Sequence, residues 1–283
     1  MKLLVFGKTG QVATALGQYR NVTLLGRDTA DLTNPDACAA IIQQTNTDAV
    51  INAAAFTAVD LAEEQEPLAT KINATAPTAM AQACATRGLP FLHISTDYVF
   101  DGSGQNPWQP DDTVSPQNAY GRSKHAGELG VINAGGNYAI LRTSWVFSPT
   151  GNNFVKTMLR LAERHPELKI VNDQFGGPTS AADIAAALVI TAKTLAGNPD
   201  KSGIYHISGA PTVSWLEFAQ SIFEKAELPV KTSGITSAQY PTPAKRPLNS
   251  RLSCASLKQA FGIQQPDWRL ALDQVLTQLK AQS

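Results

Sequence analysis

Residues 3–13 read Leu3-Leu4-Val5-Phe6-Gly7-Lys8-Thr9-Gly10-Gln11-Val12-Ala13, and this stretch decides the fold. Its apolar run predicts a strand buried on both faces, as in a parallel sheet. Gly7 and Gly10 then open a helix whose N-terminus, with its free N–H groups and dipole, can stabilise a diphosphate. The spacing G-x-x-G-x-x-A is not the G-x-G-x-x-G fingerprint, and an ordinary strand–turn–helix corner is the alternative. We expect a dinucleotide cofactor here.

Further strands are predicted at residues 22–25, 49–52, 91–94 and 138–143, with helices between them. Strand and helix alternating in this way predict an α/β fold with a right-handed, doubly wound parallel (Rossmann) sheet. A helix over residues 67–87 is expected to kink at Pro77. The pattern is less regular after residue 150. We therefore predict an NAD(P)-binding domain of residues 1–150 plus 179–198, and a smaller mixed α/β substrate-binding domain of residues 151–178 plus 199–283.

The second strand ends without the usual ribose-binding acid, and Arg27 follows it. An arginine at this place can accept a 2′-phosphate, which favours NADPH over NADH. A solvated loop arginine is the alternative. Asp31 and Leu32 come next and are in position to flank the adenine.

The stretch Tyr120-Gly121-Arg122-Ser123-Lys124 is where we expect the chemistry. On a helix, a phenol and an ammonium four residues apart lie on one face, and the cation is expected to lower the pKa of the phenol towards neutrality. Such a tyrosine can protonate a developing alkoxide. Ala126 and Leu129 are expected to face inward. Tyr-x-x-x-Lys is a weak motif alone and gains weight from the nucleotide-binding start upstream.

Polar and aromatic side chains follow the later strands. Thr96 and Asp97 lie at the exit of the fourth strand, where Thr96 is expected to hold a substrate carbonyl and Asp97 to contact the substrate; a turn or cap role is the alternative. Trp145 follows the fifth strand, where it either stacks on a substrate ring or fills the core. Arg246 lies on a proline-stiffened loop and suits a diphosphate, unless the loop is simply solvated. His93 is expected to be a satisfied core residue.

The composition excludes several classes of protein. Lys plus Arg and Asp plus Glu number 23 each in 283 residues, so no global basic field draws the chain to nucleic acid or to a membrane surface. No apolar run approaches the roughly 20 residues of a membrane helix. The three cysteines and four histidines show neither disulfide framework nor metal spacing. We expect a cytoplasmic protein without a metal.

Taken together, these residues resemble the extended short-chain dehydrogenase/reductases, and within them the dTDP-4-dehydrorhamnose reductase family, along essentially the whole chain. The motifs that carry this resemblance are Phe6-Gly7-Lys8-Thr9-Gly10-Gln11-Val12, Asn52-Ala53-Ala54-Ala55-Phe56-Thr57-Ala58-Val59-Asp60, Ser95-Thr96-Asp97-Tyr98-Val99-Phe100, Tyr120-Gly121-x-x-Lys124, Arg142-Thr143-Ser144-Trp145-Val146, Asn172-Asp173-Gln174-Phe175-Gly176 and Arg246-Pro247-x-Asn249-Ser250-Arg251-Leu252.

The resemblance implies reduction of the 4-keto group of dTDP-4-dehydro-beta-L-rhamnose to dTDP-beta-L-rhamnose with NADPH or NADH, the last step of dTDP-rhamnose synthesis. It implies Tyr120 as proton donor and substrate contacts from Thr96, Asp97 and Trp145. The cofactor contacts that it implies are Gly10, Gln11, Val12, Asp31, Leu32, Ala55, Phe56, Thr57, Tyr120 and Lys124.

One departure from the family concerns assembly. Some members resemble metal-bridged dimers that use acids where this chain has Ala15 and Ala182, so neither that metal nor that dimer is expected, and we predict a monomer or weak homodimer. Two other functions stay open at this stage. One is a reductase or epimerase of another nucleotide sugar, and the other is a non-catalytic NADP-binding regulatory subunit.

Overall fold

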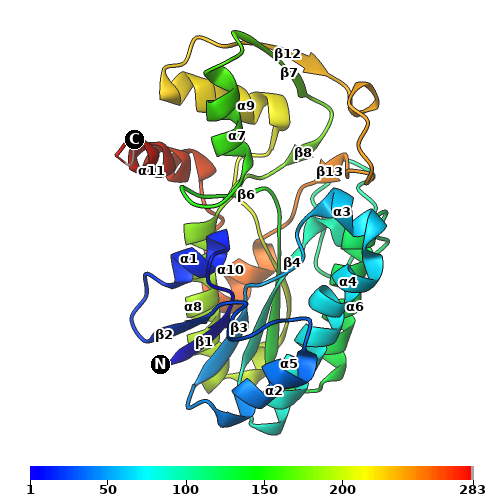
Figure 1. Ribbon diagram of the computed structural model, residues 1–283, viewed down its shortest axis with the longest axis vertical. Helices are drawn as coiled ribbons and strands as arrows, with labels where there is room; N and C mark the ends of the chain where they lie inside the picture. Colours follow the sequence, from blue (N-terminus) through cyan, green and yellow to red (C-terminus); the bar gives the residue numbers. More distant parts are fainter. Residues whose placement is uncertain (282–283) are drawn as a thin grey trace.

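A parallel sheet forms the centre of the computed structural model, which describes residues 1–281 (Figure 1). Its order is β10-β5-β4-β3-β1-β2, and every neighbouring pair runs parallel. The strands are β1 (Leu3–Phe6), β2 (Val22–Leu25), β3 (Ala49–Asn52), β4 (Phe91–Thr96), β5 (Tyr138–Thr143) and β10 (Gly203–Ile207). The doubly wound α/β fold is confirmed.

Alternate residues of the apolar strands bury two separate cores, one on each face of the sheet. Leu3 and Val5 face α1 (Gln11–Leu16), α8 (Ala181–Gly197) and α10 (Ala255–Phe261). Leu4 and Phe6 face α2 (Pro35–Gln44), α5 (Ala76–Thr86) and α6 (Ala119–Asn133). The result is a sheet between two helical layers, with every strand ending at the same edge.

Several short elements connect the longer strands and helices. They are α3 (Val59–Glu64), α4 (Glu66–Thr70), the π-helical turn η1 (Lys71–Thr75), and the 3-10 turns η2 (Asp97–Val99), η3 (Pro199–Lys201) and η4 (Ser237–Gln239). We expected a kink at Pro77 within one helix. The structure instead widens the helix into the π turn just before that proline.

The second part has its own core and lies above the carboxyl ends of the large sheet (Figure 1). Phe218, Phe147 and Trp268 pack at its centre with T-shaped ring contacts. Its elements are β6 (Val146–Phe147), α7 (Phe154–Ala162), β7 (Glu167–Val171), β8 (Phe175–Gly176), β9 (Thr179–Ser180), β11 (Val213–Ser214), α9 (Trp215–Ala226), β12 (Lys231–Ile235), β13 (Asn249–Ser250) and α11 (Trp268–Lys280).

The predicted boundary at residue 199 needs a correction. β10 pairs in parallel with β5, and Leu257 of α10 packs against the large sheet, so both elements belong with the first part of the chain. The two-domain division itself stays a prediction. Within residues 1–281, no helix combines the length and the apolar character required to cross a bilayer.

Candidate functional site

The strand order reverses between β1 and β3, and Gly7 stands at the end of β1 at this point. In open parallel sheets, ligands bind beyond the strand ends at such a switch point. Gly7 has a φ of +121°, and a Cβ there would come within 3.2 Å of the Ala13 Cβ and 3.3 Å of the Ala53 backbone. The turn therefore needs glycine, both for its conformation and for its close approach to β3.

Gly10 is the N-cap residue of α1 and offers no side chain to the helix. The first N–H groups of α1 therefore lack a side-chain cap and can bind an outside acceptor. A Cβ added to Gly10 would meet only the Ala53 carbonyl oxygen, 3.9 Å away, so the space over this helix end is open. These features fit a dinucleotide diphosphate.

Gln11 and Val12, the next two predicted cofactor contacts, have side chains that serve other partners. The amide oxygen of Gln11 accepts hydrogen bonds from Ser148 Oγ (2.8 Å) and Asn153 Nδ2 (3.0 Å). This pair ties α1 to the start of the second part of the chain. Val12 is 8% exposed within the apolar core, so it can offer only its backbone to a ligand.

The predicted adenosine-side residues lie after β2. Arg27 has 80% of its side chain exposed and pairs loosely with Asp31, at 3.6 Å. Asp31 accepts a hydrogen bond from the Thr33 backbone N–H (2.9 Å), which is the main reason that its pKa is lowered. Leu32 is buried against the core. Arg27 is thus free to turn towards a phosphate.

The segment after β3 is held by Asn73, which lies in the π turn η1. Asn73 Oδ1 accepts from the Phe56 N–H at 2.8 Å, and Asn73 Nδ2 donates to the Phe56 carbonyl at 3.0 Å. Asn73 Nδ2 also donates to Ser123 Oγ of α6 at 2.9 Å. The exit of β3, with Ala55 and the exposed Thr57, is thereby fixed beside the helix that carries Tyr120.

Tyr120 and Lys124 lie on the same side of α6, and both are directed at β4 and its exit. Lys124 Nζ donates to the Ile94 carbonyl at 2.7 Å and lies 3.2 Å from His93 Nε2. Tyr120 lies beside Thr96, whose hydroxyl acts on the pKa of the phenol, and it packs edge-to-face on Tyr98, with ring centroids 5.5 Å apart. The phenol and the amine therefore share one site.

The expectation that Lys124 lowers the pKa of Tyr120 is wrong for this structure. Burial raises the pKa of Tyr120 above its ordinary value, Asp97 and Tyr98 raise it further, and only the hydrogen bond with Thr96 lowers it. The amine of Lys124 is turned to the Ile94 carbonyl instead. Burial lowers the pKa of Lys124 to about 8.

Thr96 and Asp97 form a buried polar pair beside Tyr120. Thr96 Oγ1 donates to Asp97 Oδ1 at 3.1 Å, and Thr96 also caps η2 by accepting from the Tyr98 N–H at 3.2 Å. Asp97 Oδ2 is buried without a hydrogen-bond partner among residues 1–281. Burial raises the pKa of Asp97 to about 6. The unpaired Oδ2 of Asp97 can bind a substrate hydroxyl. Thr96 also has the cap role that was left open as an alternative in the sequence analysis.

Trp145 stands at the exit of β5 with a left-handed φ of 49°. Its ring stacks on Trp215 of α9 with centroids 3.5 Å apart and an angle of 11°. A Cβ on Gly176 would come within 2.8 Å of the Trp145 ring, so that glycine makes room for the indole. Trp145 thus joins the two parts of the chain. This packing role resembles the core-filling alternative given in the sequence analysis.

Arg246, the predicted diphosphate contact, is neither free nor simply solvated, because it is paired with an acid. Its Nη2 donates to Asp60 Oδ2 of α3 at 2.7 Å, and Asp60 Oδ1 also accepts the Ala244 N–H at 3.1 Å. Arg246 Nη1 is buried without a partner in the described chain. The guanidinium lines a small pocket with Tyr98 and Asn118, so one of its nitrogens remains for a ligand.

Sequence reasoning missed a buried ion pair behind Lys124. Arg142 of β5 binds Glu128 of α6 through two bonds of 2.8 and 2.7 Å, and both side chains are at most 2% exposed. The buried side of α6 is thus polar, whereas Ala126 and Leu129, expected inward, are exposed. The position of Arg142 inside an otherwise apolar strand could have indicated this pair, because a buried cation needs a counter-charge.

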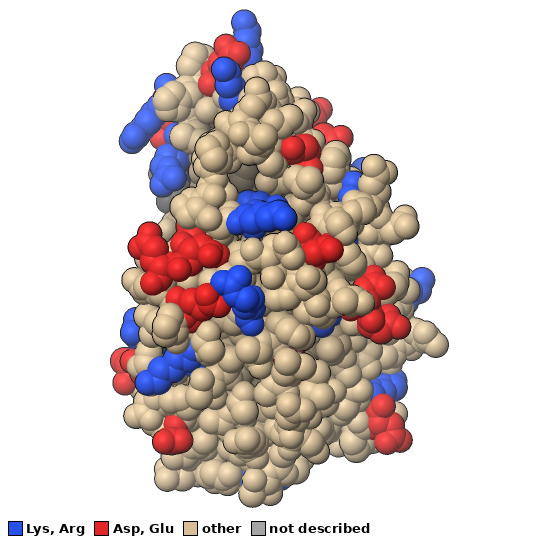
Figure 2. All heavy atoms as spheres, turned by 90° about the vertical axis from the view of Figure 1, so that its right-hand side faces the viewer, with Lys and Arg blue, Asp and Glu red and all other residues tan. Residues whose placement is uncertain are grey.

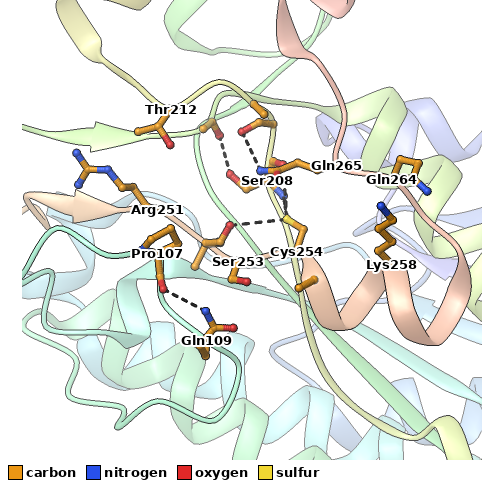
Figure 3. Close-up of a pocket in the computed structure, with 15 residues that line it drawn as sticks. Pro107, Gln109, Ser208, Thr212, Arg251, Ser253, Cys254, Lys258, Gln264 and Gln265 are labelled. Carbon is orange, nitrogen blue, oxygen red and sulfur yellow. Dashed lines mark hydrogen bonds between the residues drawn. The ribbon is translucent and has the colours of Figure 1, made fainter.

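A larger cavity, of about 490 Å³, is lined by other residues (Figure 3). Ser208, Cys254, Lys258 and Gln265 line it, and none of the predicted site residues does. On the face that carries α3, α4 and α6, basic and acidic side chains alternate without a patch of one sign (Figure 2). Among the described residues, no cluster of three or more His, Cys, Asp or Glu side chains is arranged to hold a metal ion.

Comparison with known proteins places this geometry in a family. Residues 1–281 match the family model described as the RmlD substrate binding domain. The dTDP-4-dehydrorhamnose reductase of Sinorhizobium fredii is 44% identical over 278 residues, covering 95% of this chain and 94% of the relative. The solved dTDP-4-dehydrorhamnose reductase of Clostridium acetobutylicum superposes with a TM-score of 0.92 at 37% identity, covering 99% of this chain and 100% of its own. The Bacillus anthracis enzyme, solved with NADP, gives 0.90 at 32% identity and full coverage of both chains.

Proposed function

The chain belongs to the RmlD family, which includes the dTDP-4-dehydrorhamnose reductases, and on that premise we propose that it reduces the 4-keto group of dTDP-4-dehydro-beta-L-rhamnose. The product is dTDP-beta-L-rhamnose, and the reaction is the last step of its synthesis. The chain is an NAD(P)H-dependent oxidoreductase. The observation that carries the proposal is the joint presence, at one sheet edge, of an open glycine turn and a partly buried Tyr120 beside Thr96.

The cofactor is NADPH, which when bound supplies the hydride for the ketone carbon. The backbone at Gly7 and Gly10 suits its diphosphate, because the space above the turn is open and the first N–H groups of α1 are uncapped. Arg27 is exposed and can reach a 2′-phosphate. Ala55 and Thr57 lie at the exit of β3, on the opposite side of the switch point.

Tyr120 is the proton donor in this proposal. Because burial raises the pKa of its phenol, Tyr120 keeps its proton at neutral pH, which is the state that a reduction requires. Thr96 holds the ketone oxygen within reach of the phenol. In its charged form, Lys124, one helical turn away, would donate a hydrogen bond to the nicotinamide ribose. Asp97 Oδ2 accepts a sugar hydroxyl, and Arg246 Nη1 binds the diphosphate of the substrate.

The test is the Tyr120→Phe variant, assayed by NADPH oxidation with the dTDP-keto-sugar. Turnover is expected to fall by about 10² or more, the usual contribution of a general acid. Tyr205→Phe is the matched control: it removes a hydroxyl of β10 that donates to the Lys201 carbonyl in η3, and it should leave turnover unchanged. Full turnover in Tyr120→Phe would remove Tyr120 from the mechanism.

A panel of other nucleotide keto-sugars tests the choice of base and sugar, and faster reduction of one of them would reassign the substrate.

A further inference from the structure

His93 lies at the centre of a buried line of polar groups behind the catalytic face of α6. It is 0% exposed on β4, between Asn52 of β3 and Lys124 of α6. Its Nδ1 lies 3.2 Å from Asn52 Nδ2, and its Nε2 lies 3.2 Å from Lys124 Nζ. The ring is fully buried, so each of these contacts has to match a donor with an acceptor.

The orientation of Asn52 decides which ring nitrogen carries the proton. Asn52 Oδ1 accepts the Ala54 N–H at 3.2 Å, which turns the amide nitrogen towards His93. An amide nitrogen only donates, so His93 Nδ1 has to accept. A neutral imidazole carries one proton, which then lies on Nε2 and points at Lys124. Burial, together with the charge of Lys124, keeps the pKa of His93 well below its usual value, so the ring is neutral.

An N–H pointing at Lys124 distinguishes the two forms of that side chain. A neutral amine has a lone pair and accepts the hydrogen bond, whereas an ammonium offers only donors. We propose that His93 is a positioning residue for Lys124: held by Asn52 with its proton on Nε2, it opposes the charging of the amine and sets the pH at which Lys124 becomes the ammonium beside Tyr120. This inference rests on the proposed role of that Tyr–Lys pair.

The other groups around Lys124 act in known directions. Glu128, on the next turn of α6, favours the charged form, but Arg142 from β5 binds both of its oxygens. The Ile94 carbonyl accepts from Lys124 in either form. Tyr120, on the preceding turn, is neutral until it gives up its proton. Burial is the largest effect and lowers the pKa of Lys124 to about 8, in the same direction as His93.

The first experiment reads the tautomer directly. In protein labelled with ¹⁵N-histidine, nitrogen chemical shifts separate protonated from unprotonated ring nitrogens, and the His93 signal is assigned by its loss in His93→Gln. We expect His93 to stay neutral with the proton on Nε2 at neutral pH. A proton on Nδ1, or a charged ring, overturns the proposal. Asn52→Asp gives a second test, because a carboxylate should draw the proton to Nδ1.

The second experiment follows the pH dependence of kcat. We expect kcat to fall at alkaline pH as Lys124 loses its charge. In His93→Gln, the introduced amide can turn its carbonyl oxygen to Lys124 and favour the charged form. The alkaline fall in kcat should therefore move upward by about one pH unit, as expected when one hydrogen bond changes from opposing the charge to favouring it. His206→Gln is the matched control, because His206 is a buried histidine on β10 whose Nδ1 lies 3.1 Å from the Trp108 carbonyl. In this variant, the alkaline fall in kcat should stay at the same pH. An unmoved alkaline fall in His93→Gln, with Tyr120→Phe inactive, rejects this inference and leaves the proposed function intact. Full activity in Tyr120→Phe rejects the function and leaves the tautomer measurement valid.

Discussion

The Glu128–Arg142 pair makes a quantitative prediction about stability. Glu128→Gln keeps the size of the side chain but leaves a guanidinium that is 2% exposed without its counter-charge. Breaking a buried pair in this way costs about 3–5 kcal/mol. The pKa of Glu128 gives a similar magnitude. Burial raises it, but the hydrogen bonds from Arg142 outweigh burial and bring it from 4.5 to about 2. That difference corresponds to about 3 kcal/mol of folding free energy.

The sign of this effect with pH follows from the lowered pKa. The contribution of Glu128 is fully present above pH 4.5 and is lost as the pH falls towards 2. Urea unfolding at pH 7, followed by tryptophan fluorescence, measures the loss in Glu128→Gln, with an unchanged m-value as the sign that the fold is intact. The control is Glu66→Gln. Glu66 binds Arg122 through two bonds of 2.8 Å, but these side chains are 39% and 45% exposed, so a loss below about 1 kcal/mol is expected. Equal losses in the two variants would refute the reasoning.

Two further predictions concern a glycine and the cofactor phosphate. Gly127→Ala should lower the free energy of unfolding by about 2 kcal/mol or more, because its Cβ would overlap the backbone carbonyl of Asn73. Gly197→Ala, at the end of α8 with open space around it, should gain up to about 1 kcal/mol, and a similar loss in both variants would contradict this view of the α6 contact. Arg27→Ala should raise KM for NADPH by about 10-fold, the worth of one charged hydrogen bond, and leave KM for NADH unchanged. Steady-state kinetics with both cofactors measure this, and an equal change for both would show that Arg27 does not select the phosphate.

Apolar runs explain why most of the large sheet could be predicted. The strands at residues 3–6 and 49–52 are short continuous stretches of buried side chains, as expected for the inner strands of a parallel sheet. β10 was missed because its sequence, Gly203-Ile204-Tyr205-His206-Ile207, lacks such a run and its partner β5 lies some 60 residues earlier in the chain. Pairing over that distance leaves no local pattern.

The electrostatics of the candidate site could not be predicted from the sequence, and the roles of its residues stay predictions. Tyr120 and Lys124 could be placed on one side of a helix from their spacing alone. The direction of the Tyr120 pKa could not, because it depends on how completely the fold removes water from the phenol. Likewise, nothing near Arg246 in the sequence identifies Asp60, which is brought to it from α3. Burial and long-range pairing are properties of the assembled chain.

The π turn at Lys71–Thr75 amounts to one additional residue wound into a helix. If the same residues were wound as a regular α-helix instead, α4 would be rotated by about 100° relative to α5. Ala69, now fully buried in a small cluster with Ala119 and the ring of Tyr120, would swing off that cluster. The packing beneath the reactive phenol therefore depends on the wider winding of the turn at Lys71–Thr75, which takes up the additional residue without turning Ala69 away from Tyr120.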